Sequence, residues 1–524
     1  WHKSGTSGNT VRSFYLPASP VTCIDCHMPL LPSDDQGHDN GFVRSHRFAA
    51  ANTALPFLNG HSDQLQAVQS LLQDSVATAD LFSLKINGRF YGPEDEMPEL
   101  HPGDRVECTV VVRNRGVGHT LPGGTNDSNE LWLELLAKDE DGRTILTSGH
   151  LNADGLVDST AHFWGALLVD RAGQEINKRN AQDWVATVYA RAIGPGTAHT
   201  VHYRFEVPQG AIITELSAAL LHRKFKGYFN EWTFRGYVAP GQPDSLARRD
   251  VDMRAWVFDD TEAPVLPITT MAQTRRVAGE RIHAERPLWE RWNDYGIGLF
   301  MEGDTRAALA AFEQVANLAP ENPEGSINQA RVLINEGQLE RASEALDEAE
   351  RRRPGYLKTT YFHGEVLKAA GRYDEALNEW LRVYEAFPLD RVLVLGIGRL
   401  HYLSGRYEEA LRWMDKVLQI DPEDLGAVYN RMLALGALGR EDEFATAQQL
   451  YQYHKDDEDA MAITAPFKQR FAMANREAQP IHEHELWPVI TMTLPAITRA
   501  SRTVQLQPSH GQASQKEVEK SSQR

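Results

Sequence analysis

The 524-residue sequence has few cysteines and fewer basic than acidic residues. Its three cysteines are too few for the disulfide framework that holds small secreted domains together. No apolar run approaches the roughly 18 residues of a membrane-spanning helix. With 54 basic and 72 acidic residues the formal charge is −18, which argues against nucleic acid or an anionic membrane as a partner.

Two of the three cysteines form a CxxCH motif with Cys23, Cys26 and His27. Thiols at this spacing can each add to a vinyl group of haem, and the histidine becomes the proximal iron ligand. A structural zinc site needs four ligands, and the sequence has no second CxxC. A thioredoxin-like pair is expected at the start of a helix in a βαβ unit, which this proline-flanked context does not suggest. The third cysteine, Cys108, alternates with valines and is expected to be a buried, inert thiol.

Residues 1–79 have the character of a small c-type haem segment, in which the porphyrin supplies most of the apolar core. His46, which an aromatic residue follows closely, is the best candidate for the distal ligand of the haem iron. Alternatively, His46 binds the iron of a different haem or is a surface histidine. Apolar spacing predicts a helix from Ser62 to Ala79 at the end of the segment.

The motif, with Met28-Pro29 after it and His46 further on, resembles the last haem segment of multihaem c-type cytochromes. This family is related to cytochrome c554 and pentahaem nitrite reductase, and many members carry C-terminal tetratricopeptide repeats. The resemblance implies covalent haem c, a redox partner protein, and a periplasmic or extracellular location. The family has several CxxCH motifs and this sequence has one, so we expect the others, and an export signal, upstream of Trp1.

Residues 80–260 are predicted to form an antiparallel, immunoglobulin-like β-sandwich, because short alternating segments are separated by turn signals. The expected strands are Leu81–Tyr91, Arg105–Arg113, Glu130–Lys138, Thr144–Ser148, Trp184–Tyr189, His199–Val207 and Glu215–Leu221, with an edge strand at Met253–Phe258.

A glycine-rich loop, Gly118–Asp127, lies between two of the expected strands. Loops of this kind on a rigid sandwich are where functional sites are built. The loop resembles the GHxxPTG-type loop of β-domains beside multihaem segments, which makes His119 a candidate to ligate a haem or line its edge. Two alternatives remain open: a histidine that caps the backbone, and a calcium ion held by Asp127 and nearby carbonyls.

After a linker at 261–288, residues 289–455 repeat with a period of 34. Prolines, glycines and alanines recur in step, which is the pattern of tetratricopeptide repeats: four full copies and a degenerate fifth. Such a solenoid usually has a concave binding surface, and we expect it to hold a peptide or protein ligand or to serve in assembly. Its predicted groove residues are Asn293, Asn328, Arg331, His363, Arg399 and Asn430.

Residues 456–504 are predicted to be a capping helix (Ala460–Glu477) and an extension, followed by a disordered tail at 505–524. The His482–Glu485 run resembles a fragment of a metal site, but two histidines without a distant partner favour solvated surface.

Three functions are consistent with these patterns. The first is an exported cytochrome that transfers electrons through a His-ligated haem. The second is a multihaem oxidoreductase that acts on a small nitrogen or sulfur compound at a haem upstream of Trp1. The third is a repeat-based interaction scaffold in which the CxxCH is incidental. No residue of this sequence is assigned a catalytic role.

Overall fold

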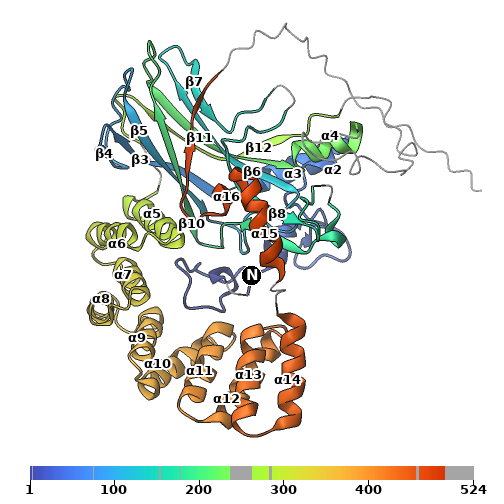
Figure 1. Cartoon of the computed structure of the whole chain (residues 1–524), viewed down its shortest axis with the longest axis vertical. Helices are drawn as coiled ribbons and strands as arrows, with labels where there is room; N and C mark the ends of the chain where they lie inside the picture. The colour runs from blue at the N-terminus through green and yellow to red at the C-terminus, as the bar shows by residue number, and fades with distance from the viewer. Residues whose placement is uncertain are drawn as a thin grey trace, which may run out of the picture.

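The structure, a computed structural model, describes residues 1–489 except 3, 75, 153–154, 178, 236–262, 283–285 and 456–458. Two β-sheets form the upper part of Figure 1, and an arc of helices, α5 to α14, forms the lower part. The first residues of the chain lie inside this arc, whereas α2 and α3 lie beside the sheets. Within the described residues no helix is long and apolar enough to cross a membrane.

The N-terminal segment is built from short elements joined by loops, and its assignment as a haem segment stays a prediction. Its last helix ends at Gln73 instead of Ala79, because the chain enters the first strand of the sandwich at Ala77. Val68 and Leu72 of this helix are buried against the sandwich core. The elements are α1 (Cys23–His27), β1 (Leu30–Pro32), β2 (Phe42–Arg44), α2 (Ala54–Leu58) and α3 (Ser62–Gln73).

The β-domain consists of two sheets with one hydrophobic core between them. Each strand turns alternate apolar side chains toward this core, as a sandwich requires. The five-stranded sheet has the order β13 (Glu483–Glu485), β10 (Ala198–Glu206), β5 (Arg105–Asn114), β3 (Ala77–Ile86), β4 (Arg89–Tyr91). The other has the order β12 (Ile268–Val277), β11 (Glu215–Lys224), β6 (Asn129–Lys138), β7 (Thr144–Ser148), β14 (Trp487–Pro488), with β8 (His162–Val169) on β6 and β9 (Ala186–Arg191) on β8.

The seven strands predicted within 80–224 are present, and their pairing is antiparallel. The segment Leu81–Tyr91 is a hairpin, β3–β4, which turns at Asn87-Gly88, where both residues have positive φ. Cys108 is buried in β5, as predicted, and burial raises the pKa of its thiol to about 12. The sequence analysis did not include β8, and the immunoglobulin-like connectivity stays a prediction.

The structure differs from the sequence analysis in the region assigned to a linker, 261–288. This region contains β12, which pairs along its length with β11 and so extends the sheet beyond residue 260. Its alternation is hard to recognise because an arginine occupies an inward position: Arg276 is 2% exposed and donates hydrogen bonds to the carbonyls of Phe82 and Gly92. The predicted edge strand Met253–Phe258 lies outside the described residues.

The 34-residue repeats form five helical pairs, and the glycine at each turn within a pair has a positive φ, between 70° and 91°. This left-handed conformation ends the first helix of each pair, as the repeat pattern predicts. Gly296 allows close packing, since a Cβ atom there would lie 2.7 Å from Phe312. The helices are α5 (Leu288–Glu302), α6 (Thr305–Leu318), α7 (Glu324–Asn335), α8 (Leu339–Arg352), α9 (Leu357–Ala369), α10 (Tyr373–Ala386), α11 (Arg391–Leu403), α12 (Tyr407–Ile420), α13 (Leu425–Ala437) and α14 (Glu441–His454).

The first repeat helix, α5, also packs on the five-stranded sheet. Phe82 of β3 meets the ring of Trp292 edge-on, with centroids 4.9 Å apart. Arg291, 3% exposed, forms a bidentate ion pair with Asp80 at 2.7 and 2.8 Å. Bidentate guanidinium–carboxylate pairs fix orientation, so the solenoid begins in a defined position on the sandwich.

The C-terminal helices do not cap the solenoid as predicted. Instead α15 (Asp459–Arg470) and α16 (Ala472–Ala478) pack on β8 and β9, where Phe467 and Ala474 join a cluster with Val169 and Val188. The following strand, β13, pairs in parallel with β10. This position corrects the prediction of solvated surface at His482–Glu485, because the side chain of His484 is fully buried.

Candidate functional site

The CxxCH motif forms one turn of helix, α1. Its start is fixed by Thr22 and Asp25: the Asp25 carboxylate accepts hydrogen bonds from the Thr22 backbone N–H at 2.9 Å and hydroxyl at 2.6 Å. Such a capping box stabilises a helix start that would otherwise fray. Positions three and four apart share a helix face, so Cys23, Cys26 and His27 are arranged on one side of the turn.

The side chain of His27 lies next to that of His119. Their rings are nearly parallel, with an interplanar angle of 8° and centroids 6.5 Å apart. Two imidazoles bound on opposite sides of one iron, each through a nitrogen about 2 Å from the metal, have centroids about 6 Å apart. The structure therefore brings together two of the predicted haem residues from segments 92 positions apart (119 − 27) at a spacing that suits a shared iron.

The two histidines offer the same nitrogen. Nδ1 of His27 lies 2.7 Å from the carbonyl oxygen of Ala49, and Nδ1 of His119 lies 2.9 Å from that of Thr120. Because a carbonyl only accepts, each Nδ1 carries the proton and each Nε2 keeps its lone pair. Iron-binding histidines are commonly held in this way, through a backbone carbonyl on the other ring nitrogen.

The loop that carries His119 is shaped to hold the ring. A Cβ atom on Gly123 would lie 2.6 Å from its Cε1, so only glycine fits there. At Gly118 the nearest atoms belong to Thr6 and Trp1, both 3.1 Å from a Cβ position, so the loop is packed against the N-terminal segment.

The surroundings of the motif are apolar yet exposed. Seven large hydrophobic side chains between Cys23 and Phe57 are 38–58% exposed, and no residue of α1 is buried. Such a concentration of exposed apolar side chains marks a surface that another molecule covers. A porphyrin is an apolar ligand of suitable size, so this feature fits the predicted haem. The seven are Ile24, Leu30, Leu31, Phe42, Phe48, Leu55 and Phe57.

The other predicted haem ligand, His46, is exposed, and of the two candidates it is His119 that the structure pairs with the ring of His27. A role of His46 at another haem stays a prediction. The thiols are free, and partial burial raises the pKa of Cys26.

The concave groove of the repeats already contains a peptide: the chain's own segment Asn9–Tyr15. Val11 is 1% exposed within the repeat core, and its backbone N–H donates to Asp390 at 3.3 Å. Lys358 donates to the carbonyl oxygen of Phe14 at 3.3 Å. The Tyr15 hydroxyl donates to Asp294 at 2.6 Å. Buried contacts of this kind attach the start of the haem segment to the repeats.

Three of the predicted groove residues hold this segment. Asn293 donates to the Tyr15 hydroxyl at 2.8 Å. The side-chain amide of Asn328 donates to the side-chain oxygen of Asn293 at 2.9 Å and so supports Asn293. Arg331 donates to the carbonyl of Arg12, and its guanidinium lies 4.2 Å from the ring centroid of Phe14. The sequence analysis identified the groove but not its occupant.

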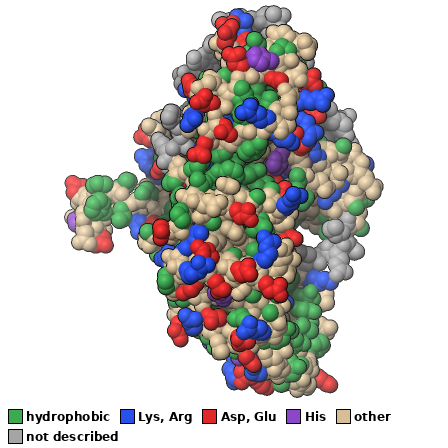
Figure 2. All heavy atoms as spheres, turned by 90° about the vertical axis from the view of Figure 1, so that its left-hand side faces the viewer, with side chains coloured by type: hydrophobic (Ala, Val, Ile, Leu, Met, Phe, Trp, Pro, Cys, Tyr) green, Lys and Arg blue, Asp and Glu red, His purple; other side chains and the backbone are tan. Residues whose placement is uncertain are grey.

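The other predicted groove residues, His363, Arg399 and Asn430, lie further along the arc. In the part of the chain that the structure describes, none of them forms a hydrogen bond or an ion pair with residues 9–15. His363 is 3.9 Å from Asp347, and Asn430 donates to the Gly426 carbonyl on its own helix. On the face shown in Figure 2, acidic and basic side chains are interspersed without a large patch of one sign.

Comparisons with known proteins agree on the repeats. Two tetratricopeptide repeat family models match residues 299–358 and 363–424. The Protein CTR9 homolog of Arabidopsis thaliana is 27% identical over 148 residues, which is 28% of this chain. The chain spans only 10% of the length of that relative. The matched regions confirm that the chain contains tetratricopeptide repeats.

Solved structures were also compared. A structure of MamA from Desulfovibrio magneticus RS-1 is 22% identical, with a TM-score of 0.28, covering 33% of this chain and 95% of its own. YrrB, described as a TPR protein with an unusual peptide-binding site, is 17% identical with a TM-score of 0.28, covering 35% of this chain and 93% of its own. PilF of Pseudomonas aeruginosa is 16% identical with a TM-score of 0.30, covering 36% of this chain and 88% of its own. None of these matches concerns haem.

Proposed function

We propose that this chain is part of an exported c-type cytochrome that transfers electrons through a haem attached at Cys23 and Cys26. His27 and His119 are the proposed axial ligands. The observation that carries the proposal is the pairing of these two rings at 6.5 Å, each with its Nδ1 hydrogen-bonded to a backbone carbonyl. When bound, the haem supplies a one-electron couple.

The residues of the chain define what such a site can do. His27 and His119 would both hold the haem iron, which would suit electron relay rather than binding of a substrate. The exposed apolar side chains from Ile24 to Phe57 would cover the porphyrin and exclude water from it. A redox partner protein is the implied partner, and the repeats supply a surface for docking or assembly.

The attachment is tested by producing the chain with an export signal in a host that assembles c-type cytochromes, and measuring covalent haem as the pyridine haemochrome. We expect covalent haem in the wild type and none in the Cys23→Ser/Cys26→Ser double variant. Cys108→Ala is the matched control, because this thiol is buried in β5 and should leave haem content unchanged. Wild-type protein without covalent haem would contradict the proposal.

A second candidate function is an interaction scaffold without haem, and the matches to repeat family models favour it. In that case the repeats are the functional part and the CxxCH turn is incidental. The haemochrome measurement separates the two, because a scaffold of this kind contains no covalent haem and still binds its partner.

A further inference from the structure

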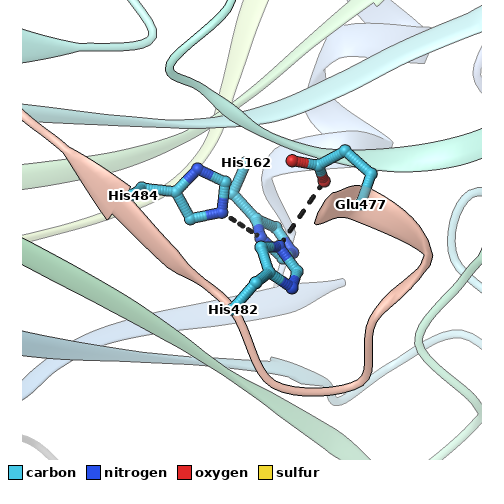
Figure 3. Close-up of side chains that lie close together, drawn as sticks. All are labelled: His162, Glu477, His482 and His484. Carbon is cyan, nitrogen blue, oxygen red and sulfur yellow. Dashed lines mark hydrogen bonds and ion pairs between the residues drawn. The ribbon is translucent and has the colours of Figure 1, made fainter. Parts of the chain in front are cut away.

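Four side chains that the cytochrome proposal does not use converge inside the β-domain: His162, Glu477, His482 and His484. One ligand atom of each lies within 4.8 Å of those of the other three. Figure 3 shows them pointing toward one another; His162 belongs to β8, Glu477 to α16, His484 to β13, and His482 to the loop between α16 and β13. Nothing in the repeats or the haem segment requires this arrangement.

The hydrogen bonds leave the lone pairs of two of these rings directed inward. Nδ1 of His484 lies 2.8 Å from the Thr160 carbonyl oxygen, and Nδ1 of His482 lies 3.1 Å from that of Gln479. Each Nδ1 therefore donates, and each Nε2 is an acceptor. This backbone support is the arrangement that orients metal-binding histidines.

The third ring, His162, is 3% exposed and incompletely satisfied. Its Nδ1 lies 3.0 Å from Nε2 of His484, and its Nε2 has no hydrogen-bond partner. An unpaired buried polar atom costs about 1–3 kcal/mol, so native proteins rarely retain one without a reason. The other ring nitrogen, Nδ1, faces His484, and a cation bound there would take the place of this contact.

The fourth side chain, Glu477, supplies the only negative charge of the four. Its Oε2 lies 3.5 Å from Nε2 of His482. Arg191 and Arg476 donate to the carboxylate at 2.6 and 2.9 Å, which orients it as a supporting shell does. Arg191 also approaches Nε2 of His482 at 3.2 Å, and a metal ion would replace this contact.

We propose that His162, His482, His484 and Glu477 bind one divalent transition metal ion of the Zn²⁺ type. Three imidazoles and one carboxylate are a ligand set that zinc accepts, with bonds of about 2.0–2.2 Å in a tetrahedron. Tetrahedral bonds of that length put the ligand atoms about 3.3 Å apart, close to the 3.0 and 3.5 Å of the two nearest pairs. With four protein ligands the site is closed, so its role is structural.

The ion would join distant parts of the chain. His162 belongs to β8, whereas the other three ligands lie between α16 and β13, more than 300 residues later. Beyond α16 the backbone pairing of this segment is short, since β13 has three residues and β14 two. The metal would fasten this C-terminal segment to the sandwich.

The proposal is tested on the full chain after treatment with a chelator and gel filtration, by calorimetric titration with Zn²⁺ alone. We expect one equivalent to bind and to raise the melting temperature. His484→Gln and His482→Gln should each weaken binding at least 100-fold, and circular dichroism checks their folding. His101→Gln is the matched control, because this histidine is exposed and pairs only with Glu99 at 4.0 Å.

Replacing Zn²⁺ by Co²⁺ gives an independent readout, because tetrahedral cobalt has a characteristic visible spectrum. We expect that spectrum in the wild type and its loss in His482→Gln, which lies at the outer side of the cluster and is the variant most certain to fold. Equal Zn²⁺ binding by wild type and both variants would overturn the proposal. So would a wild type that binds no Zn²⁺.

Discussion

Two groups of histidines in this protein are arranged in opposite ways. His27 and His119 stand at the surface, 6.5 Å apart, with exposed apolar side chains around them. His162 and His484 are buried and touch each other at 3.0 Å, with a carboxylate close by. The first pair leaves room for a large planar group, and the second leaves room for a single ion.

The difference shows how burial and spacing determine which ligand a histidine site accepts. Both groups use a backbone carbonyl to fix the ring tautomer, as at Ala49 for His27 and Thr160 for His484. The tautomer therefore does not distinguish them. The two groups are distinguished by the separation of their lone pairs and by the polarity of their surroundings.

The largest expected effect concerns the surface pair. His119→Ala should convert the low-spin haem spectrum to high-spin almost completely, because the iron loses its sixth ligand. His46→Ala is the matched control and should keep the low-spin spectrum, since His119 and not His46 faces His27. Visible and electron paramagnetic resonance spectra measure both. A high-spin His46→Ala with a low-spin His119→Ala would reverse the assignment of the distal ligand.

The second effect concerns the buried cluster. Removing the metal with a chelator should lower the melting temperature, because a ligand present at 1,000 times its dissociation constant stabilises the fold by about 4 kcal/mol. The haem spectrum should stay the same, since covalent haem is not removed by a chelator. Differential scanning calorimetry with and without added Zn²⁺ measures the change. An unchanged melting temperature would mean that the two groups of histidines do not differ as proposed.

The smallest effect concerns His222, a buried histidine in neither group. Its two ring nitrogens have no partner, and burial lowers its pKa to about 3. The unfolded chain therefore binds more protons than the folded one between about pH 6.5 and pH 3, and stability falls as the pH falls through this window. The loss at pH 5 is on the order of 2 kcal/mol.

The variant His222→Leu removes this titration and should make stability less dependent on pH between 7 and 5. Urea unfolding at several pH values measures the slope. The slope should not vanish, because burial also lowers the pKa of His199, to about 4. An unchanged slope would mean that His222 is protonated in the folded protein.

The sequence predicted the features that depend on local patterns. The CxxCH turn and the 34-residue period are each contained in short stretches, so their residues could be recognised one after another. The strands of the sandwich alternate clearly, and the seven predicted between 80 and 224 are present. The loop around His119 was also recognised, because glycines and proline separate it from its strands.

The features that the sequence did not predict depend on contacts between distant segments. His162 and His484 are 322 positions apart, and nothing in either neighbourhood indicates the other. Likewise, residues 9–15 have no pattern that would predict a place in the repeat groove. In β12 the buried Arg276 conceals the alternation, because a charged side chain occupies an inward position, where its Nη2 donates to carbonyls of other segments.

The segment Asn9–Tyr15 in the repeat groove also limits how far Cys23 can lie from the first repeat. Tyr15 is held by Asp294 and Asn293 of the first repeat, and Cys23 lies only eight positions further along the chain (23 − 15). A fully extended chain of that length spans about 28 Å. The segment thus acts as a short tether, and any haem on Cys23 travels no further than this from the first repeat, whatever partner the solenoid carries.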